Sequence, residues 1–185
     1  HQTLASTWEH ELHSLEGAAL SHRSAVAIHP HDLDSMLEAA RLCRALGQHE
    51  LSRSYAHGAS LLAEEAHYRD RALSALAIAN YRLGETAAAK DALASLAHLR
   101  RDDGDLYEHL ARAAGKIGEL DEAVEYGVRA IRLLEARHPS RARTIAEWLH
   151  SLDPSRDDLI ALYASLLARE GFGRASLALL ALSAM

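Results

Sequence analysis

The sequence predicts an all-α protein, a solenoid of stacked helical hairpins, and three observations support this fold class. The chain is rich in Ala, Leu, Arg and Glu and has only 3 Pro in 185 residues. It contains no run of alternating β-branched residues, which a strand would need. Glycines recur between amphipathic helical runs, because Gly84 follows Gly47 by 37 residues and Gly118 follows Gly84 by 34.

The expected helices can be assigned in order from these patterns. Residues 3 to 28 are expected to form one or two helices that cover the first repeat. Pro30 and Asp32 then break the helix and restart it, with Asp32 as a helix cap. Three hairpins are expected next, at 33–46 with 49–65, 70–83 with 86–100, and 105–117 with 121–137.

The regular spacing then changes, because Gly171 follows Gly118 by 53 residues. We therefore expect an extra helix at 140–152, bracketed by Pro139 and Pro154. A last hairpin is expected at 157–170 with 173–185. Trp148 on the extra helix is expected to seal a junction between hairpins, rather than to act as an exposed anchor.

The stretch from Gly104 to Arg137 resembles the tetratricopeptide repeat family. It has an aromatic residue, a Leu-small pair, a turn glycine and small residues in the second helix, namely Tyr107, Leu110, Ala111, Gly118, Ala123 and Ala130. The copy from Asp70 to Asp103 keeps Leu73, Leu76, Ala77, Gly84 and Ala89. A weaker copy begins at Leu33 and keeps Met36, Ala39, Ala40, Gly47, Ser52 and Ala59.

The resemblance implies one helical repeat domain over residues 1–185. Its parts are an N-terminal cap or partial repeat at 1–32, repeats at 33–69, 70–103 and 104–137, the extra helix at 138–156 and a C-terminal hairpin at 157–185. The sequence has no initiator Met and ends inside an apolar helix, so we expect it to be a fragment of a longer chain.

Composition and motifs favour a protein that is not an enzyme and needs no cofactor. His10 and His13 are three residues apart, but HELH lacks the four-residue spacing of the zinc signature, so no metal site is expected. No catalytic constellation is found, and Cys43 is expected to be a buried apolar residue rather than a nucleophile.

The charge and hydropathy of the chain narrow its expected partners. The net charge of -6 argues against nucleic-acid binding. No apolar run reaches the roughly 20 residues that span a bilayer, so no membrane insertion is expected. The compartment is unknown, with the cytoplasm slightly favoured.

The resemblance also implies a concave groove, lined by the first helices of the hairpins, that binds a peptide or helical segment of a partner protein. The residues expected to face it are Leu37, Arg41, Arg44, Ser74, Ile78, Tyr81, Glu108, Arg112 and Lys116. Its basic residues would pair with acidic groups, and Leu37, Ile78 and Tyr81 would accept an apolar side chain. For any one arginine, ordinary solvated charge is the alternative.

These observations predict a protein-interaction scaffold or adaptor, with an assembly or secretion chaperone as one form of it. The family's carboxylate clamp is not matched, because Arg41 and Ile78 stand where its two asparagines are expected. Two alternatives remain open. The chain is a regulatory or substrate-docking domain of a larger enzyme, or it self-associates as a homo-oligomer through its apolar C-terminal helix.

Overall fold

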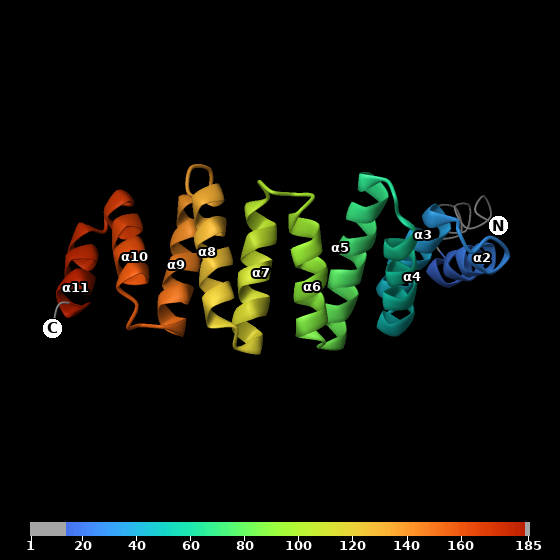
Figure 1. Ribbon diagram of the computed structural model, residues 1–185, viewed down its shortest axis with the longest axis horizontal. Coiled ribbons are helices and arrows are strands. Elements are labelled where there is room, and N and C mark those ends of the chain that lie inside the picture. Colours follow the sequence, from blue (N-terminus) through green and yellow to red (C-terminus); the bar gives the residue numbers. More distant parts are fainter. Residues whose placement is uncertain (1–13, 184–185) are drawn as a thin grey trace. The chain divides into compact units, whose positions relative to one another are not determined.

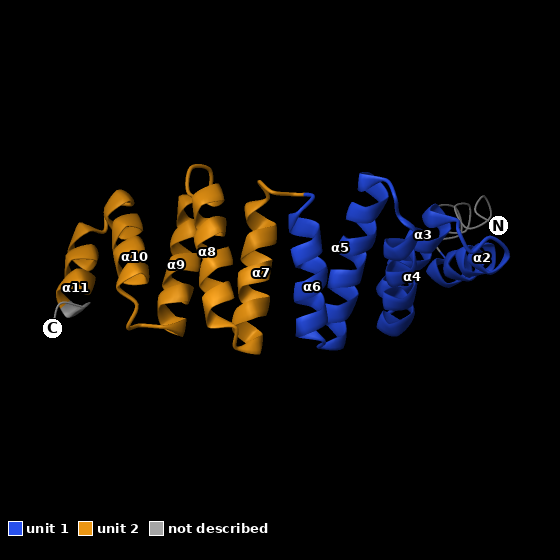
Figure 2. Ribbon diagram, viewed as in Figure 1, with its two compact units in different colours: residues 1–99 blue, residues 100–185 orange. Residues whose placement is uncertain are grey.

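The computed structural model describes residues 14–183, and every regular element in that range is an α-helix (Figure 1). The all-α prediction is therefore confirmed for these residues. The predictions for residues 3 to 13, including His10 and His13, lie outside the described residues. The chain divides into two compact units, His1–Leu99 and Arg100–Met185 (Figure 2). A single domain over the whole chain stays a prediction.

Unit 1 consists of consecutive helices in which each described helix packs against the next. They are α2 (Leu15–Ile28), α3 (Leu33–Ala45), α4 (His49–Leu62), α5 (Ala66–Leu83) and α6 (Thr86–Ala97). Helix α3 also contacts α5, so two first helices of successive hairpins are neighbours. Small side chains such as Ala39 and Ala56 are fully buried, which lets the helices approach closely.

Unit 2 consists of α7 (Gly104–Ile117), α8 (Leu120–Leu134), α9 (Pro139–Leu152), α10 (Asp157–Arg169) and α11 (Gly173–Ser183). Consecutive helices again pack against each other (Figure 1). The approach of α9 to α8 is close at Gly127, where an added Cβ would lie 2.7 Å from a methyl carbon of Leu149. A larger residue at this position would force Leu149 or the two helices to shift.

The four turn glycines singled out in the sequence all end helices in the left-handed conformation. Gly47, Gly84, Gly118 and Gly171 have φ values of 74°, 81°, 85° and 89°. After Gly118, the N–H of Glu119 donates to the carbonyl of Ala114 at 3.0 Å, which closes the helix end. The equivalent bond after Gly171 runs from Phe172 to Leu167 at 2.8 Å. The α10–α11 hairpin therefore uses the same turn as the earlier hairpins.

The predicted helix starts are also present. The Asp32 carboxylate accepts the Ser35 N–H at 3.1 Å as an N-cap, and Pro139 occupies the first turn of α9. The ends of α4, α6 and α8 each come three residues earlier than predicted, at Leu62, Ala97 and Leu134. The larger difference is that α5 begins at Ala66, not at 70. The extra turn of α5 is held by Tyr68, which donates to Asp34 at 3.0 Å, and by Arg69, which donates to the Ala63 carbonyl at 3.0 and 3.2 Å.

The extra helix expected at 140–152 is present as α9, and it packs like a first helix. Pro139 follows Gly104, the start of α7, by 35 residues, which is close to one repeat. Its buried residues have the first-helix spacing i, i+3, i+4, i+7, namely Ala142, Ile145, Ala146 and Leu149. In α7 the same spacing is occupied by the buried residues Tyr107, Leu110, Ala111 and Ala114.

Candidate partner-binding surface

In unit 1 the nominated residues lie on the neighbouring first helices α3 and α5. Ile78 and Tyr81 of α5 are 42% and 60% exposed, and their spacing of three residues places them on one helix face. Ser74 lies one turn before Ile78 and is half-buried. This face of α5 therefore offers large apolar side chains to solvent.

Leu37 was expected to share this apolar surface, and that expectation is wrong. Leu37 is only 5% exposed and packs in a cluster with Met36, Ala59 and Ala72. Tyr68, from the additional first turn of α5, packs against the same cluster. The additional turn of α5 therefore helps to cover Leu37, near the start of α3.

Arg41 and Arg71 share Glu38 on α3 as an acidic partner. Arg41 Nε lies 2.8 Å from Glu38, and the Arg71 guanidinium lies 3.4 Å from both Glu38 and Asp34. Glu38 therefore receives one arginine from its own helix and one from α5. Since Arg41 already has this intramolecular partner, it is less available to a partner protein than the sequence suggested.

Glu108 on α7 has the same two kinds of arginine partner in unit 2. Arg112 Nε donates to it at 3.0 Å from one turn later on the same helix, and Arg141 of α9 donates at 2.9 and 3.1 Å. Arg141 also lies 2.6 Å from Asp105. The Glu108 side chain is only 12% exposed beneath these two guanidinium groups.

The two networks are equivalent, because Arg71 follows Glu38 by 33 residues and Arg141 follows Glu108 by 33. Sequence reasoning missed both Arg71 and Arg141. An arginine near the start of one first helix, one repeat after a glutamate, is the signal that would have found them. Partial burial lowers the pKa of Arg141, but the hydrogen bond and charge of Glu108, together with Asp105, outweigh burial and raise it.

Trp148 joins α9 to α7, as expected of a residue that seals a junction. The Arg112 guanidinium lies over its ring, 4.8 Å from the centroid. A Cβ added at Gly115 of α7 would lie 3.0 Å from the Trp148 ring. Arg112 is therefore held both by Glu108 and by this aromatic ring.

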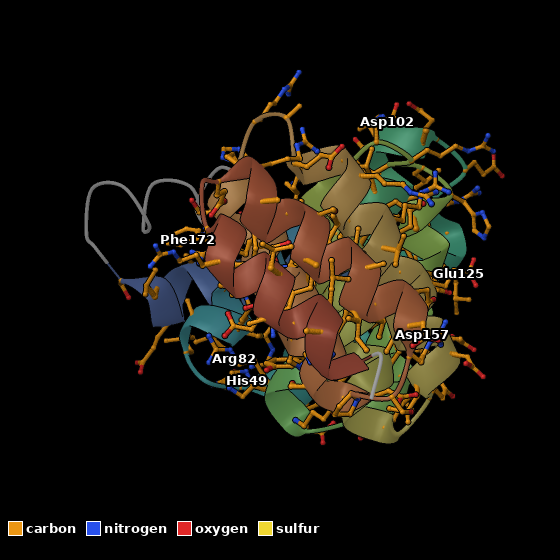
Figure 3. The ribbon with its side chains drawn as sticks, turned by 90° about the vertical axis from the view of Figure 1, so that its left-hand side faces the viewer. His49, Arg82, Asp102, Glu125, Asp157 and Phe172 are labelled. Carbon is orange, nitrogen blue, oxygen red and sulfur yellow. The ribbon has the colours of Figure 1, made fainter. Side chains whose placement is uncertain are left out.

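The remaining nominated cations differ in their surroundings. Lys116, at the end of α7, is exposed. Arg44 is half-buried near the end of α3, and among the described residues no ion pair holds it. Arg44 precedes Tyr81 by 37 residues, the same spacing as Gly47 and Gly84, so the two residues lie at the same level of adjacent first helices. Arg82, the residue after Tyr81, is exposed as well (Figure 3).

Residues 14–183 contain no group of three or more His, Cys, Asp or Glu side chains placed to hold a metal ion. Cys43 is buried as expected, and burial raises the pKa of its thiol although the charge of Arg23 lowers it. In the described part of the chain, each helix is too short or too polar to cross a membrane.

No protein-family model matches the sequence, and no curated protein sequence is significantly similar to it. Solved structures are similar in fold. MamA from Desulfovibrio magneticus superposes with a TM-score of 0.60 at 12% identity, over 98% of this chain and 89% of that one. PilF from Pseudomonas aeruginosa gives a TM-score of 0.57 at 18% identity, over 91% and 80% of the two chains.

A third similar structure is YrrB, described as a TPR protein with an unusual peptide-binding site. It gives a TM-score of 0.52 at 16% identity, over 87% of this chain and 89% of that one. Identities this low support a shared fold and no more. Together with the glycine turns and the spacing of the helices, they show that this chain has the fold of tetratricopeptide repeat proteins.

Proposed function

We propose that the chain is a protein-interaction scaffold that binds a segment of a partner protein on the first helices α3 and α5. The observation that carries the proposal is the exposed pair Ile78 and Tyr81 on one face of α5. Large apolar side chains on a rigid helix gain free energy when a partner's apolar side chain covers them. No catalytic role is assigned to these residues.

Arg44 gives the proposed surface its charge preference. It lies at the level of Tyr81 on the adjacent helix, and no ion pair within the described residues neutralises it. A partner segment with an apolar residue close to an acidic one would therefore fit. Arg41 contributes less, because Glu38 already holds it. Ser74 remains a secondary member of the proposed surface, whereas Glu108, Arg112 and Lys116 belong to unit 2 and are not part of it.

The test compares partner binding after glutamate replaces apolar residues of this surface with partner binding after the same replacement elsewhere in unit 1. Proteins captured from a lysate of the source organism by the unchanged chain are quantified against an Ile78→Glu, Tyr81→Glu variant. Leu61→Glu is the matched control, because Leu61 is an exposed leucine, 73% accessible, on the second helix α4. We expect a specific partner to be lost with the double variant and retained with the control.

Retention of every partner by the double variant, with its helix content unchanged, would overturn the proposed surface. Once a partner is identified, Arg44→Glu is expected to weaken binding by about tenfold, the equivalent of one charge-assisted contact. An assembly or secretion chaperone or adaptor is the form of scaffold that we propose. A partner that is an unassembled subunit or a secreted protein would support that form.

Self-association is a second candidate, and α11 favours it. Leu177 in this helix is 70% exposed, and Phe172 at the preceding turn is 49% exposed (Figure 3). A second copy that packed against this face would bury both side chains. Sedimentation velocity over a range of concentrations tests this directly. A mass that rises with concentration, and no longer rises in Leu177→Glu, would support self-association.

A further inference from the structure

A hollow of about 510 Å³ opens in unit 1 between the second helices α4 and α6, with α5 as its floor. None of the residues proposed above to bind a partner lines it. The hollow exists because its α6 wall carries small side chains at Ala88, Ala92 and Ser95, which share one helix face. Leu73 and Leu76 of α5 form an apolar floor that is only partly buried.

Asn80 provides an unsatisfied acceptor in this hollow. The residue lines the hollow and is only 4% exposed, yet its Oδ1 atom has no hydrogen-bond partner. A buried carbonyl oxygen without a donor is unfavourable, because it has lost water and gained nothing in return. The Oδ1 atom is covered by its neighbours, so a donor group in the hollow would remove this penalty once the Asn80 side chain rotates to expose it.

Two serine hydroxyls and one carboxylate of the lining are also acceptors. The Ser54 hydroxyl donates to the Glu50 carbonyl at 3.0 Å, and the Ser95 hydroxyl donates to the Asp91 carbonyl at 3.0 Å. Each hydroxyl has used its proton on its own helix and keeps lone pairs for a donor. The exposed Asp91 carboxylate lies on the α6 wall, and no ion pair within the described residues neutralises it.

The positive charge already present in the lining is neutralised. Arg53 lies 2.7 Å from Glu85, which lines the same hollow, and 2.5 Å from Glu50 on its own helix. The two carboxylates leave Arg53 little attraction for an incoming anion. The hollow therefore combines an apolar floor, a buried acceptor and an unneutralised carboxylate.

We propose that this hollow binds the side chain of an arginine carried by a partner protein. The methylene groups of the arginine would cover Leu73 and Leu76, as long basic side chains do on apolar surfaces. Its guanidinium group would donate to Asn80 Oδ1 and pair with Asp91. The five N–H groups of arginine can satisfy several acceptors at once, which a lysine ammonium with three N–H groups does less completely. The hollow, at about 510 Å³, is large enough to hold a long side chain.

The test uses blocked pentapeptides of alanine with arginine, citrulline or norleucine at the central position. Citrulline keeps the shape of arginine without its charge, and norleucine keeps only an apolar chain. Each peptide is titrated into the ¹⁵N-labelled protein, and amide shifts are followed by NMR. We expect the arginine peptide to shift amides of α4, α5 and α6 around the hollow, and to bind about tenfold more tightly than either analogue.

Three variants make the test specific. Asp91→Asn and Asn80→Leu are each expected to weaken binding of the arginine peptide by about tenfold. Glu125→Gln removes an exposed carboxylate from α8, outside the hollow, and is expected to leave binding unchanged (Figure 3). Asp91 is exposed, so its variant is expected to fold normally, and the melting temperature of each variant is measured beside its affinity.

Equal binding of the arginine and citrulline peptides would overturn the proposal. Amide shifts confined to other helices, or no shift at millimolar peptide, would overturn it as well. These outcomes are independent of the surface formed by Ile78 and Tyr81, because the peptides lack the apolar and acidic residues expected to bind there.

Discussion

Arg141 of α9 donates two hydrogen bonds to Glu108 of α7, at 2.9 and 3.1 Å, and so connects the two helices. The two residues are 33 positions apart in the chain. In unit 1 Arg71 approaches Glu38 at 3.4 Å with the same separation in sequence. The first contact is short and its carboxylate is mostly covered, whereas the second is longer and its carboxylate is more exposed.

We therefore expect Arg141→Ala to lower the free energy of unfolding by about 1 to 2 kcal/mol, because it leaves the mostly covered Glu108 carboxylate paired with Arg112 alone among these two arginines. Arg71→Ala is expected to cost about 0.5 kcal/mol or less, as exposed ion pairs do. Urea denaturation of both variants measures the difference. Equal losses would show that burial of Glu108 does not strengthen its ion pair.

Gly127→Ala is expected to destabilise the fold by about 1 to 3 kcal/mol through overpacking. The new Cβ would lie 2.7 Å from Leu149, so either the packed Leu149 side chain or the two helices α8 and α9 must shift to admit it. Gly173→Ala is the control, because no atom lies within 4 Å of its added Cβ. Thermal unfolding should show a lower Tm for the first variant only. A normal Tm for Gly127→Ala would mean that Leu149 can move aside at little cost.

Leu37→Ala tests the corrected position of Leu37. Because this side chain is buried in the cluster with Met36, its truncation is expected to cost about 2 to 5 kcal/mol. Leu61→Ala removes the same atoms from a side chain that is 73% exposed, and is expected to change stability by about 0.5 kcal/mol or less. Similar stabilities of the two variants would show that the Leu37 side chain is not buried.

Asp158 is expected to contribute to the pH dependence of the folding stability. Arg156 donates to both of its carboxylate oxygens, at 3.0 and 2.8 Å, and this hydrogen bonding lowers the pKa of Asp158 below its ordinary value of 3.8. A lowered pKa in the folded state stabilises the fold above the unfolded-state pKa. That contribution is lost as the pH falls through the folded-state pKa.

The Tm difference between the unchanged chain and Asp158→Asn should therefore be larger at neutral pH than at about pH 3. Asp102→Asn, at an exposed loop position, is the control for the removal of one negative charge (Figure 3). A Tm difference that stays constant with pH in Asp158→Asn would contradict the role given to Arg156.

Local signals in the sequence were sufficient for most of the fold. The turn glycines and the cap at Asp32 act within one helix end, so their chemistry can be recognised from a few neighbouring residues. The burial of Leu37 could not be predicted in this way. It depends on Tyr68, which reaches the same cluster only because α5 begins one turn earlier than expected.

The candidate sites were predicted less completely, because they depend on contacts between distant residues. Ile78 and Tyr81 were nominated from their repeat positions and are exposed. Arg71 and Arg141 were missed because their acidic partners lie one repeat earlier. The acceptor at Asn80 was missed for a similar reason, since only the folded structure shows that its Oδ1 is buried without a donor.

The acidic and arginine-bearing first helices alternate along the chain, since α3 and α7 carry the glutamates and α5 and α9 carry the arginines that reach them. Glu108 follows Glu38 by 70 residues, and Arg141 follows Arg71 by the same number. A single hairpin copied within the gene would thus place two first helices of the same type in succession. Two hairpins, about 70 residues, are the shortest duplication that would preserve the alternation and give each new acidic helix its arginine.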